Sequence, residues 1–193
     1  MRYILHLLLV LLLASCNGDK SSAPVNKHRN IPKSQKFVGK DSIFSIELSS
    51  PFQQLRYTGR DTLSTIFGDA IQDAYVIDND TLSMIISIAS YDDEVFNKRK
   101  DRTLFESAIN MFLHSLNAKK TTTHTCKKNI KSTVLNGERT FFSFSSDGKR
   151  YFGVSEMYSR NARIHHLCII SKNKEDFLNS DHIALAFSSY QPR

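Results

Sequence analysis

The stretch VLNGERTFFSFSSDGKRYFGVSEMYSRNARIHHLCIIS, residues 134–171, carries the strongest fold signal in the chain. Its Asn136-Gly137 and Asp147-Gly148 pairs are typical of type I′ hairpin turns, and Arg160-Asn161 is a weaker turn signal. Turns of this kind join consecutive antiparallel strands. The stretch therefore predicts a four-stranded meander, with strands near residues 129–135, 139–146, 149–159 and 163–171.

Three further strands are predicted upstream, at residues 42–48, 70–76 and 82–91. In the first, Phe44, Ile46 and Leu48 alternate with polar residues and therefore share one face. The third is apolar enough to lie in the middle of a sheet that is covered on both faces. Between the first two strands, up to about Gly68, the sequence shows no regular pattern.

Two helices are predicted to accompany these strands. Thr103-Leu-Phe-Glu106 has the form of a capping box, in which the Thr hydroxyl and the Glu carboxylate satisfy backbone N–H groups. A second helix is expected from about Lys174 to Phe187. The order of elements predicts an α+β domain, an antiparallel β-sheet with helices packed on it. The first helix should pack through an apolar stripe made by Phe105, Ala108, Ile109, Phe112 and Leu116.

Over about residues 37–193 the chain resembles the Mog1/PsbP-like domains of short bacterial lipoproteins. Phe44–Phe52 resembles the opening strand of that family, which runs into a proline and an aromatic residue. Val134–Gly137 resembles the central turn, and Ala186–Ser188 the closing helix, although the Ser-Phe pair stands here in reverse order. The resemblance implies an α/β/α sandwich that binds partners, with no shared catalytic residues. Fold alone does not assign a function.

The N-terminal residues 1–15 predict a lipoprotein signal peptide. Arg2 precedes an apolar run that ends at Leu13, and two small residues follow it. The run is about half of the ~20 residues that a membrane-spanning helix needs. Leu13-Ala14-Ser15-Cys16 resembles a lipobox, which implies that Cys16 carries a thioether-linked diacylglycerol and becomes the acylated first residue. The alternative is an ordinary signal peptide in which Cys16 has no lipid.

Residues 16–36 predict a lipidated cysteine and a disordered basic tether, followed by a single domain over residues 37–193. Of the formal net charge of +7, Arg2 contributes +1 and residues 17–36 contribute +4, which leaves +2 for the domain. A nearly neutral domain disfavours a nucleic-acid partner. Asn17 follows the cysteine where an aspartate often retains lipoproteins in the inner membrane. We therefore expect a Gram-negative outer-membrane protein that faces the periplasm.

The sharpest chemical pattern is the doublet His124-Thr-Cys126 and His166-Leu-Cys168. Residues i and i+2 of a strand share a face, so two such pairs on adjacent strands would form a tetrahedral metal site. In a meander, however, the two strands lie three spacings apart, roughly 14 Å at ~4.8 Å each. This separation disfavours a metal site, and the sequence leaves open a Cys126–Cys168 disulfide or two free thiols.

Other functional motifs are absent or weak. His165 and His166 are neighbours on one predicted strand, and we expect one to be packed and the other exposed. The chain has no nucleophile elbow, no S-x-x-K and no phosphate-binding glycine loop, which predicts no enzymatic activity and no cofactor. Asp-Ser/Thr-apolar triplets resemble an O-glycosylation sequon of exported bacterial proteins. Their candidate acceptors are Ser42, Thr62 and Thr81.

These observations favour a lipid-anchored envelope protein whose domain binds an unknown envelope partner without doing chemistry. An immunity protein or chaperone that neutralises a secreted toxin is the first alternative. A hydrolase with an unrecognised site is the second. The membrane is the one partner that the sequence itself indicates, through the lipid on Cys16.

Overall fold

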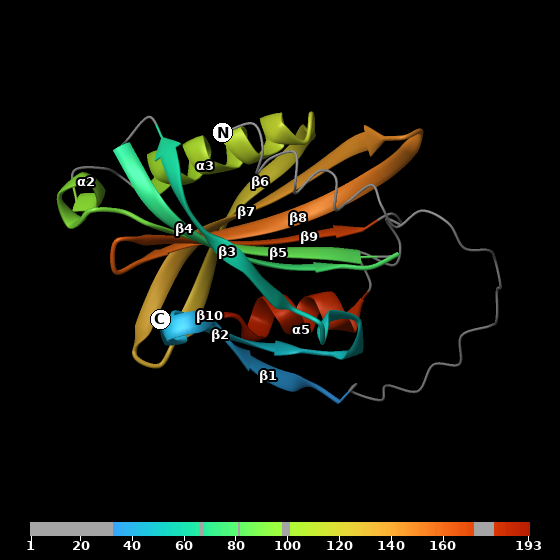
Figure 1. Cartoon of the computed structure of the whole chain (residues 1–193), viewed down its shortest axis with the longest axis horizontal. Coiled ribbons are helices and arrows are strands. Elements are labelled where there is room, and N and C mark those ends of the chain that lie inside the picture. The colour runs from blue at the N-terminus through green and yellow to red at the C-terminus, as the bar shows by residue number, and fades with distance from the viewer. Residues whose placement is uncertain (1–32, 66–67, 81, 98–100, 172–179) are drawn as a thin grey trace.

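The computed structural model describes residues 33–65, 68–80, 82–97, 101–171 and 180–193 (Figure 1). The predicted signal peptide, the lipid-attachment residue Cys16 and the tether up to residue 32 lie outside these residues. Gln35 and Lys36, which the sequence assigned to the tether, belong to the first strand. No helix in the described part of the chain is both long and apolar enough to cross a membrane.

A seven-stranded antiparallel sheet forms the centre of the domain (Figure 1). Every neighbouring pair of its strands runs antiparallel, and the long meander forms one half of the sheet. In spatial order the strands are β3 (Arg56–Thr65), β4 (Gly68–Asp78), β5 (Leu82–Ser90), β9 (Arg163–Ser171), β8 (Lys149–Arg160), β7 (Thr133–Ser146) and β6 (Lys119–Ile130).

The two faces of this sheet are covered differently. Helix α3 (Asp101–Ser115) lies on one face, and α5 (Asp181–Ser189) lies on the other beside a small three-stranded sheet (Figure 1). That small sheet contains β1 (Gln35–Val38), β2 (Phe44–Leu48) and β10 (Gln191–Pro192). A short helix, α2 (Asp93–Asn97), precedes α3. The fold is therefore mostly antiparallel sheet, richer in strands than the α/β/α sandwich expected from the sequence.

Alternating side chains of the central strand β5 divide the hydrophobic core into two clusters. Met84, Ile86 and Ile88 point to the α5 side, where they join Phe44, Tyr75 and other buried residues of the small sheet and α5. Ile85 and Ala89 of β5 point to the opposite face and pack with α3. This arrangement confirms the prediction that β5 is a central strand covered on both faces.

The prediction of a hairpin turn at Asn136-Gly137 is wrong. Both residues lie inside β7, and the chain reverses instead at Lys131-Ser132, where Lys131 has a φ of 52°. Gly137 is required for another reason: a Cβ there would lie 2.6 Å from Cδ1 of Tyr158 and closer still to the Met157 carbonyl oxygen. The glycine thus permits close packing of β7 on β8.

The other turns are confirmed in place or nearly so. Asp147 and Gly148 both have positive φ values, 51° and 71°, as a type I′ turn requires. The turn predicted at Arg160-Asn161 is shifted by one residue to Asn161-Ala162. Strands β8 and β9 match their predicted ranges closely.

Three strands were missed: β10 has only two residues, and β1 and β3 show little hydrophobic alternation. β3 is an edge strand whose side chains are mostly exposed, and β1 has no buried residue.

The prediction of a capping box at Thr103–Glu106 is also wrong, since α3 begins at Asp101 and Glu106 pairs with Arg102 at 3.1 Å. The predicted apolar stripe of this helix is confirmed, with Phe105, Ile109 and Leu116 buried. Helix α5 begins at Asp181 among the described residues, whereas residues 174–179 of its predicted range lie outside them.

Candidate functional site

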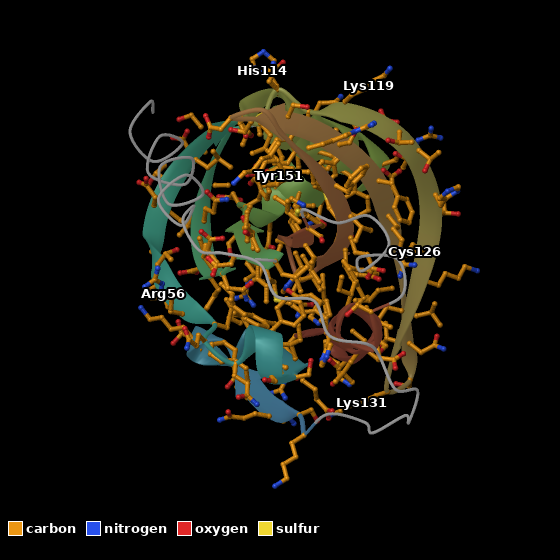
Figure 2. The ribbon with its side chains drawn as sticks, turned by 90° about the vertical axis from the view of Figure 1, so that its right-hand side faces the viewer. Arg56, His114, Lys119, Cys126, Lys131 and Tyr151 are labelled. Carbon is orange, nitrogen blue, oxygen red and sulfur yellow. The ribbon has the colours of Figure 1, made fainter. Side chains whose placement is uncertain are left out.

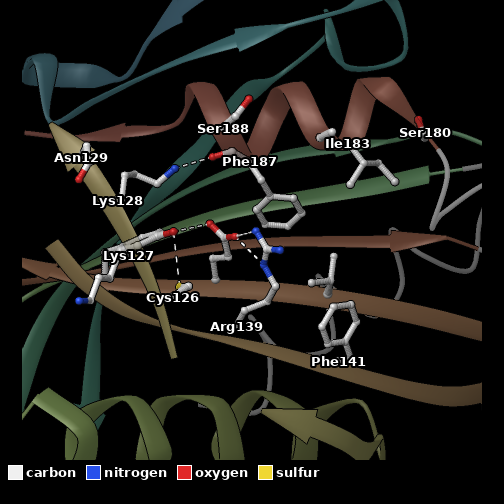
Figure 3. Close-up of a pocket in the computed structure, with 14 residues that line it drawn as sticks. Cys126, Lys127, Lys128, Asn129, Arg139, Phe141, Ser180, Ile183, Phe187 and Ser188 are labelled. Carbon is white, nitrogen blue, oxygen red and sulfur yellow. Dashed lines mark hydrogen bonds and ion pairs between the residues drawn. The ribbon is translucent and has the colours of Figure 1, made fainter. Parts of the chain in front are cut away.

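A groove of about 590 Å³ lies between α5 and the face of β6, β7 and β8 (Figure 3). Apolar side chains form much of its walls, with Phe141 and Val154 on the sheet and Ile183 and Phe187 on the helix. Arg139, whose side chain is 42% exposed, is among the charged residues that reach it. The groove therefore combines an apolar surface with accessible charge, as ligand and peptide sites commonly do.

A chain of polar contacts crosses the strands beneath this groove (Figure 3). Arg139 on β7 forms an ion pair with Glu156 on β8, and the Glu156 side chain is 1% exposed. The Tyr158 hydroxyl donates a 2.5 Å hydrogen bond to the second carboxylate oxygen of Glu156. The Sγ atom of Cys126 on β6 lies 3.6 Å from the same hydroxyl. Both carboxylate oxygens thus have donors, which compensates for the burial of the charge.

Lys128 connects β6 to α5 at one end of the groove. Its Nζ donates a 2.5 Å hydrogen bond to the carbonyl oxygen of Phe187, in the last turn of α5, and lies 5.2 Å from the centre of the Tyr158 ring. Carbonyls in a final helical turn lack partners within the helix and attract cations. Burial lowers the pKa of Lys128, an effect that the charge of Glu156 opposes.

The protonation of the groove residues limits what they can do chemically. Burial raises the pKa of the Cys126 thiol, so at neutral pH it is not a thiolate, the form of cysteine that attacks substrates and binds metals. Burial, together with the Glu156 charge, also raises the pKa of Tyr158. The thiol and the phenol therefore stay protonated and serve as donors within the cluster.

The structure separates the two His-Cys pairs that the sequence singled out. His124 and Cys126 lie on β6, whereas His166 and Cys168 lie on β9, three strands further in. Cys126 faces the α5 side, and Cys168 is buried with the α3 cluster on the opposite face. Both cysteines are free thiols, so the disulfide alternative is wrong. Within the described residues, no group of three His, Cys, Asp or Glu side chains is placed to hold a metal ion.

The adjacent histidines point to opposite faces as expected, but neither is exposed. His165 is 0% exposed and its Nδ1 lies 3.0 Å from the Tyr190 hydroxyl, while His166 is 8% exposed and packs edge-on against Phe112. The expectation that one is exposed is wrong, because β9 is covered by α5 and the small sheet on one side and by α3 on the other. Burial lowers the pKa of His165 to about 3 and that of His166 to about 4.

The three candidate glycosylation sites have different positions. Ser42 is exposed in a short 3₁₀ turn, and Thr62 is exposed on the edge strand β3. Thr81 lies outside the described residues.

Sequence reasoning missed four residues of the groove cluster: Lys128, Arg139, Glu156 and Tyr158. A charged residue inside an otherwise apolar strand was the available signal, because Glu156 stands among buried residues from Gly153 to Tyr158. Its partner Arg139 could not be found from the sequence, since the incorrect turn at Asn136-Gly137 placed Arg139 at the start of a strand. The strand registry of Arg139 with Glu156 shows that they are direct neighbours.

The sequence matches no known family and no curated protein. Solved structures nevertheless resemble the fold. The solution structure of cyanobacterial PsbP (CyanoP) from Synechocystis superimposes with a TM-score of 0.55 at 4% identity, covering 88% of this chain and 98% of that one. A Bacteroides thetaiotaomicron protein superimposes with a TM-score of 0.47 at 11% identity, covering 82% of this chain and 48% of that one. A Pseudomonas aeruginosa protein of unknown function superimposes with a TM-score of 0.41 at 8% identity, covering 83% of this chain and 97% of that one. The match to CyanoP indicates that the chain has a PsbP-like fold.

Proposed function

We propose that the protein is a lipoprotein of the Gram-negative cell envelope whose PsbP-like domain binds a partner protein and catalyses no reaction. Lipid on Cys16 attaches it to the outer membrane on the periplasmic side, and the basic tether after Cys16 separates the domain from the bilayer. A flexible chain of about 20 residues has an end-to-end distance on the order of 25 Å. The domain can therefore reach partners near the membrane surface.

The cluster of Cys126, Tyr158, Glu156 and Arg139 is the observation that carries the non-catalytic part of the proposal. A general base must be accessible to the substrate, as the 1% exposed Glu156 side chain is not, and a cysteine or tyrosine nucleophile must lose its proton at working pH. Here both Glu156 oxygens accept hydrogen bonds, and burial raises the pKa values of the Cys126 thiol and the Tyr158 hydroxyl. A cluster with this bonding supports a fixed binding surface better than a reaction centre.

Fractionation with fatty-acid labelling tests the anchor in a Gram-negative host that expresses the full chain. The wild-type protein should take up an alkyne-labelled fatty acid and sediment with the outer membrane. Cys16→Ala should lose the label and become soluble. Cys126→Ala is the matched control, because it removes a cysteine from the groove and should keep both label and membrane location. Soluble, unlabelled wild-type protein would refute the anchor.

Partner binding is tested separately, by chemical cross-linking in the same cells followed by mass spectrometry. A protein that cross-links to the wild type and not to a Phe187→Glu variant would support binding at the groove. A folding check by circular dichroism must accompany this variant, since Phe187 is 5% exposed. Turnover of a substrate that is lost in Cys126→Ala or Glu156→Gln would contradict the non-catalytic proposal.

A further inference from the structure

The strand β6 forms an open edge of the large sheet. It is 12 residues long, and among the described strands it pairs with β7 alone. Figure 2 shows it along one side of the molecule, with Lys119 near one end, Lys131 beyond the other and Cys126 between them. The outward backbone N–H and C=O groups of such a strand are a template for another strand.

Positive charge is concentrated along this edge. From residue 117 to residue 137 the sequence contains five lysines and no aspartate or glutamate. The whole domain, residues 37–193, has a net charge of only +2, so its remaining residues together carry −3. Lysines protect open edges from aggregation, because like charges repel a second copy of the same strand. The same lysines attract an acidic chain.

The groove adjoins the same edge. Cys126, Lys127, Lys128 and Asn129 of β6 line it, and Lys127 and Asn129 are exposed. Side chains of an added strand would alternate between the two faces of the sheet. Those on the α5 side would point toward the groove, where apolar walls and the half-exposed Arg139 guanidinium are available.

We infer that the β6 edge and the adjoining groove together bind an extended, acidic segment of a partner protein. The inference rests on the proposed partner-binding function and specifies its site and ligand chemistry. Main-chain hydrogen bonds to β6 give affinity, as in other cases of strand addition, and the side chains give specificity. Carboxylates pair with Lys119 and Lys127, and apolar side chains that face α5 enter the groove.

Two other occupants fit the surface less well. In a β6–β6 dimer the lysines at the ends of the strand would repel each other, because like charges on neighbouring strands are unfavourable. An anionic bilayer would attract the lysines but offers no row of amides and carbonyls to the strand edge. Charge and open backbone together favour an acidic peptide.

Selection from a displayed octapeptide library against the purified full chain tests this inference. We expect enriched peptides to carry several Asp or Glu residues together with apolar residues. A selected peptide should lose at least tenfold in affinity for the double variant Lys119→Glu/Lys127→Glu. The matched control Lys33→Glu/Lys36→Glu makes the same change in charge on exposed residues near or in β1, and should change affinity less than twofold.

The backbone part of the inference has its own test. Methylation of alternate peptide nitrogens removes the donors that pair with a strand edge and should abolish binding, whereas methylation of the intervening nitrogens should not. Selected peptides without acidic residues, an equal loss in both double variants, or indifference to methylation would overturn the inference. So would dimerisation through β6 in sedimentation experiments, or binding of Cys16→Ala protein to phosphatidylglycerol vesicles in place of peptide.

Peptide selection does not depend on the membrane anchor. The proposed lipid anchor and the proposed peptide site at β6 can therefore be contradicted independently. Loss of labelling and membrane location with peptide binding intact contradicts the anchor alone. A partner that cross-links in cells but is unaffected by Lys119→Glu/Lys127→Glu contradicts the site and leaves the binding function standing.

Discussion

The Nζ of Lys128 donates a hydrogen bond to the carbonyl oxygen of Phe187, and this contact ties the edge strand β6 to the end of α5. Lys128 is 8% exposed, so its ammonium group has little contact with water. A buried charge without its partner is costly. Lys128 therefore helps to hold the end of α5 over the sheet, in addition to the buried apolar residues Ile183 and Ala186 of the helix.

Lys128→Met should lower the free energy of unfolding by about 1.5 kcal/mol, the scale of a hydrogen bond to a charged group. Methionine keeps most of the side-chain volume, so that the loss reports mainly on the contact with Phe187. Urea denaturation measures the change. The neighbouring Lys127→Met, at an exposed position, should stay within about 0.5 kcal/mol. Equal effects would show that the contact contributes nothing.

Arg139→Met should destabilise the protein by about 3 kcal/mol, because it leaves the buried carboxylate of Glu156 without its cation. The matched control is Arg102→Met. Arg102 also pairs with a glutamate, Glu106, but both side chains are at least half exposed, and such pairs contribute less than about 1 kcal/mol. Thermal or urea unfolding distinguishes the two variants. Similar losses for both would contradict the burial argument for Glu156.

The buried histidines predict loss of stability in acid. Their folded pKa values, about 3 for His165 and about 4 for His166, lie below the unfolded value of roughly 6.5. The unfolded chain therefore takes up protons first as the pH falls below 6.5, and stability is lost until the pH passes the folded values. Each histidine should contribute a slope of about 1.4 kcal/mol per pH unit within that window.

Urea denaturation between pH 7 and pH 4.5 measures this slope. His166→Phe should make it shallower by the contribution of one histidine, since phenylalanine fits the apolar contact with Phe112 and does not titrate. His124→Phe is the control, because it makes the same substitution at an exposed position on β6. A slope that His166→Phe leaves unchanged would contradict the predicted contribution of His166.

Gly137→Ala should cost about 1–3 kcal/mol, the range for overpacking, since the added Cβ would contact the Tyr158 ring and the Met157 carbonyl. Asn136→Ala, at the exposed neighbouring position, should have little effect. Were Asn136-Gly137 a hairpin turn, both residues would need positive φ and both substitutions would be destabilising. Comparison of the two unfolding free energies decides between turn and strand.

The incorrect turn prediction at Asn136-Gly137 shows which parts of the fold local sequence patterns predict and which they do not. Apolar alternation and turn dipeptides predicted β2, β4, β5, β8 and β9, since those strands have buried faces. Asn-Gly is a strong local turn signal, but the close approach of Tyr158 is a tertiary contact that no local pattern reveals. The mostly exposed edge strand β3 gave no periodic signal at all.

Most residues of the candidate site could not be predicted from the sequence, for a related reason. Cys126 was singled out, but with the wrong partners, because His166 and Cys168 lie three strands further in and Cys168 is buried on the opposite face. Its actual neighbours, Tyr158 and Glu156, are set by strand registry and by packing of α5. The run of lysines without acidic residues is visible in the sequence. Only the structure shows that this run lies on an edge strand, β6.

Photo-cross-linking in living cells tests whether a partner protein binds at the β6 edge. A benzoylphenylalanine at Asn129, exposed on β6 at the groove, is compared with one at Thr62, exposed on the opposite edge strand β3. We expect one specific protein adduct at Asn129, through an acidic segment of the partner, and none at Thr62. Adducts at Thr62 alone, or the same adducts at both positions, would contradict it.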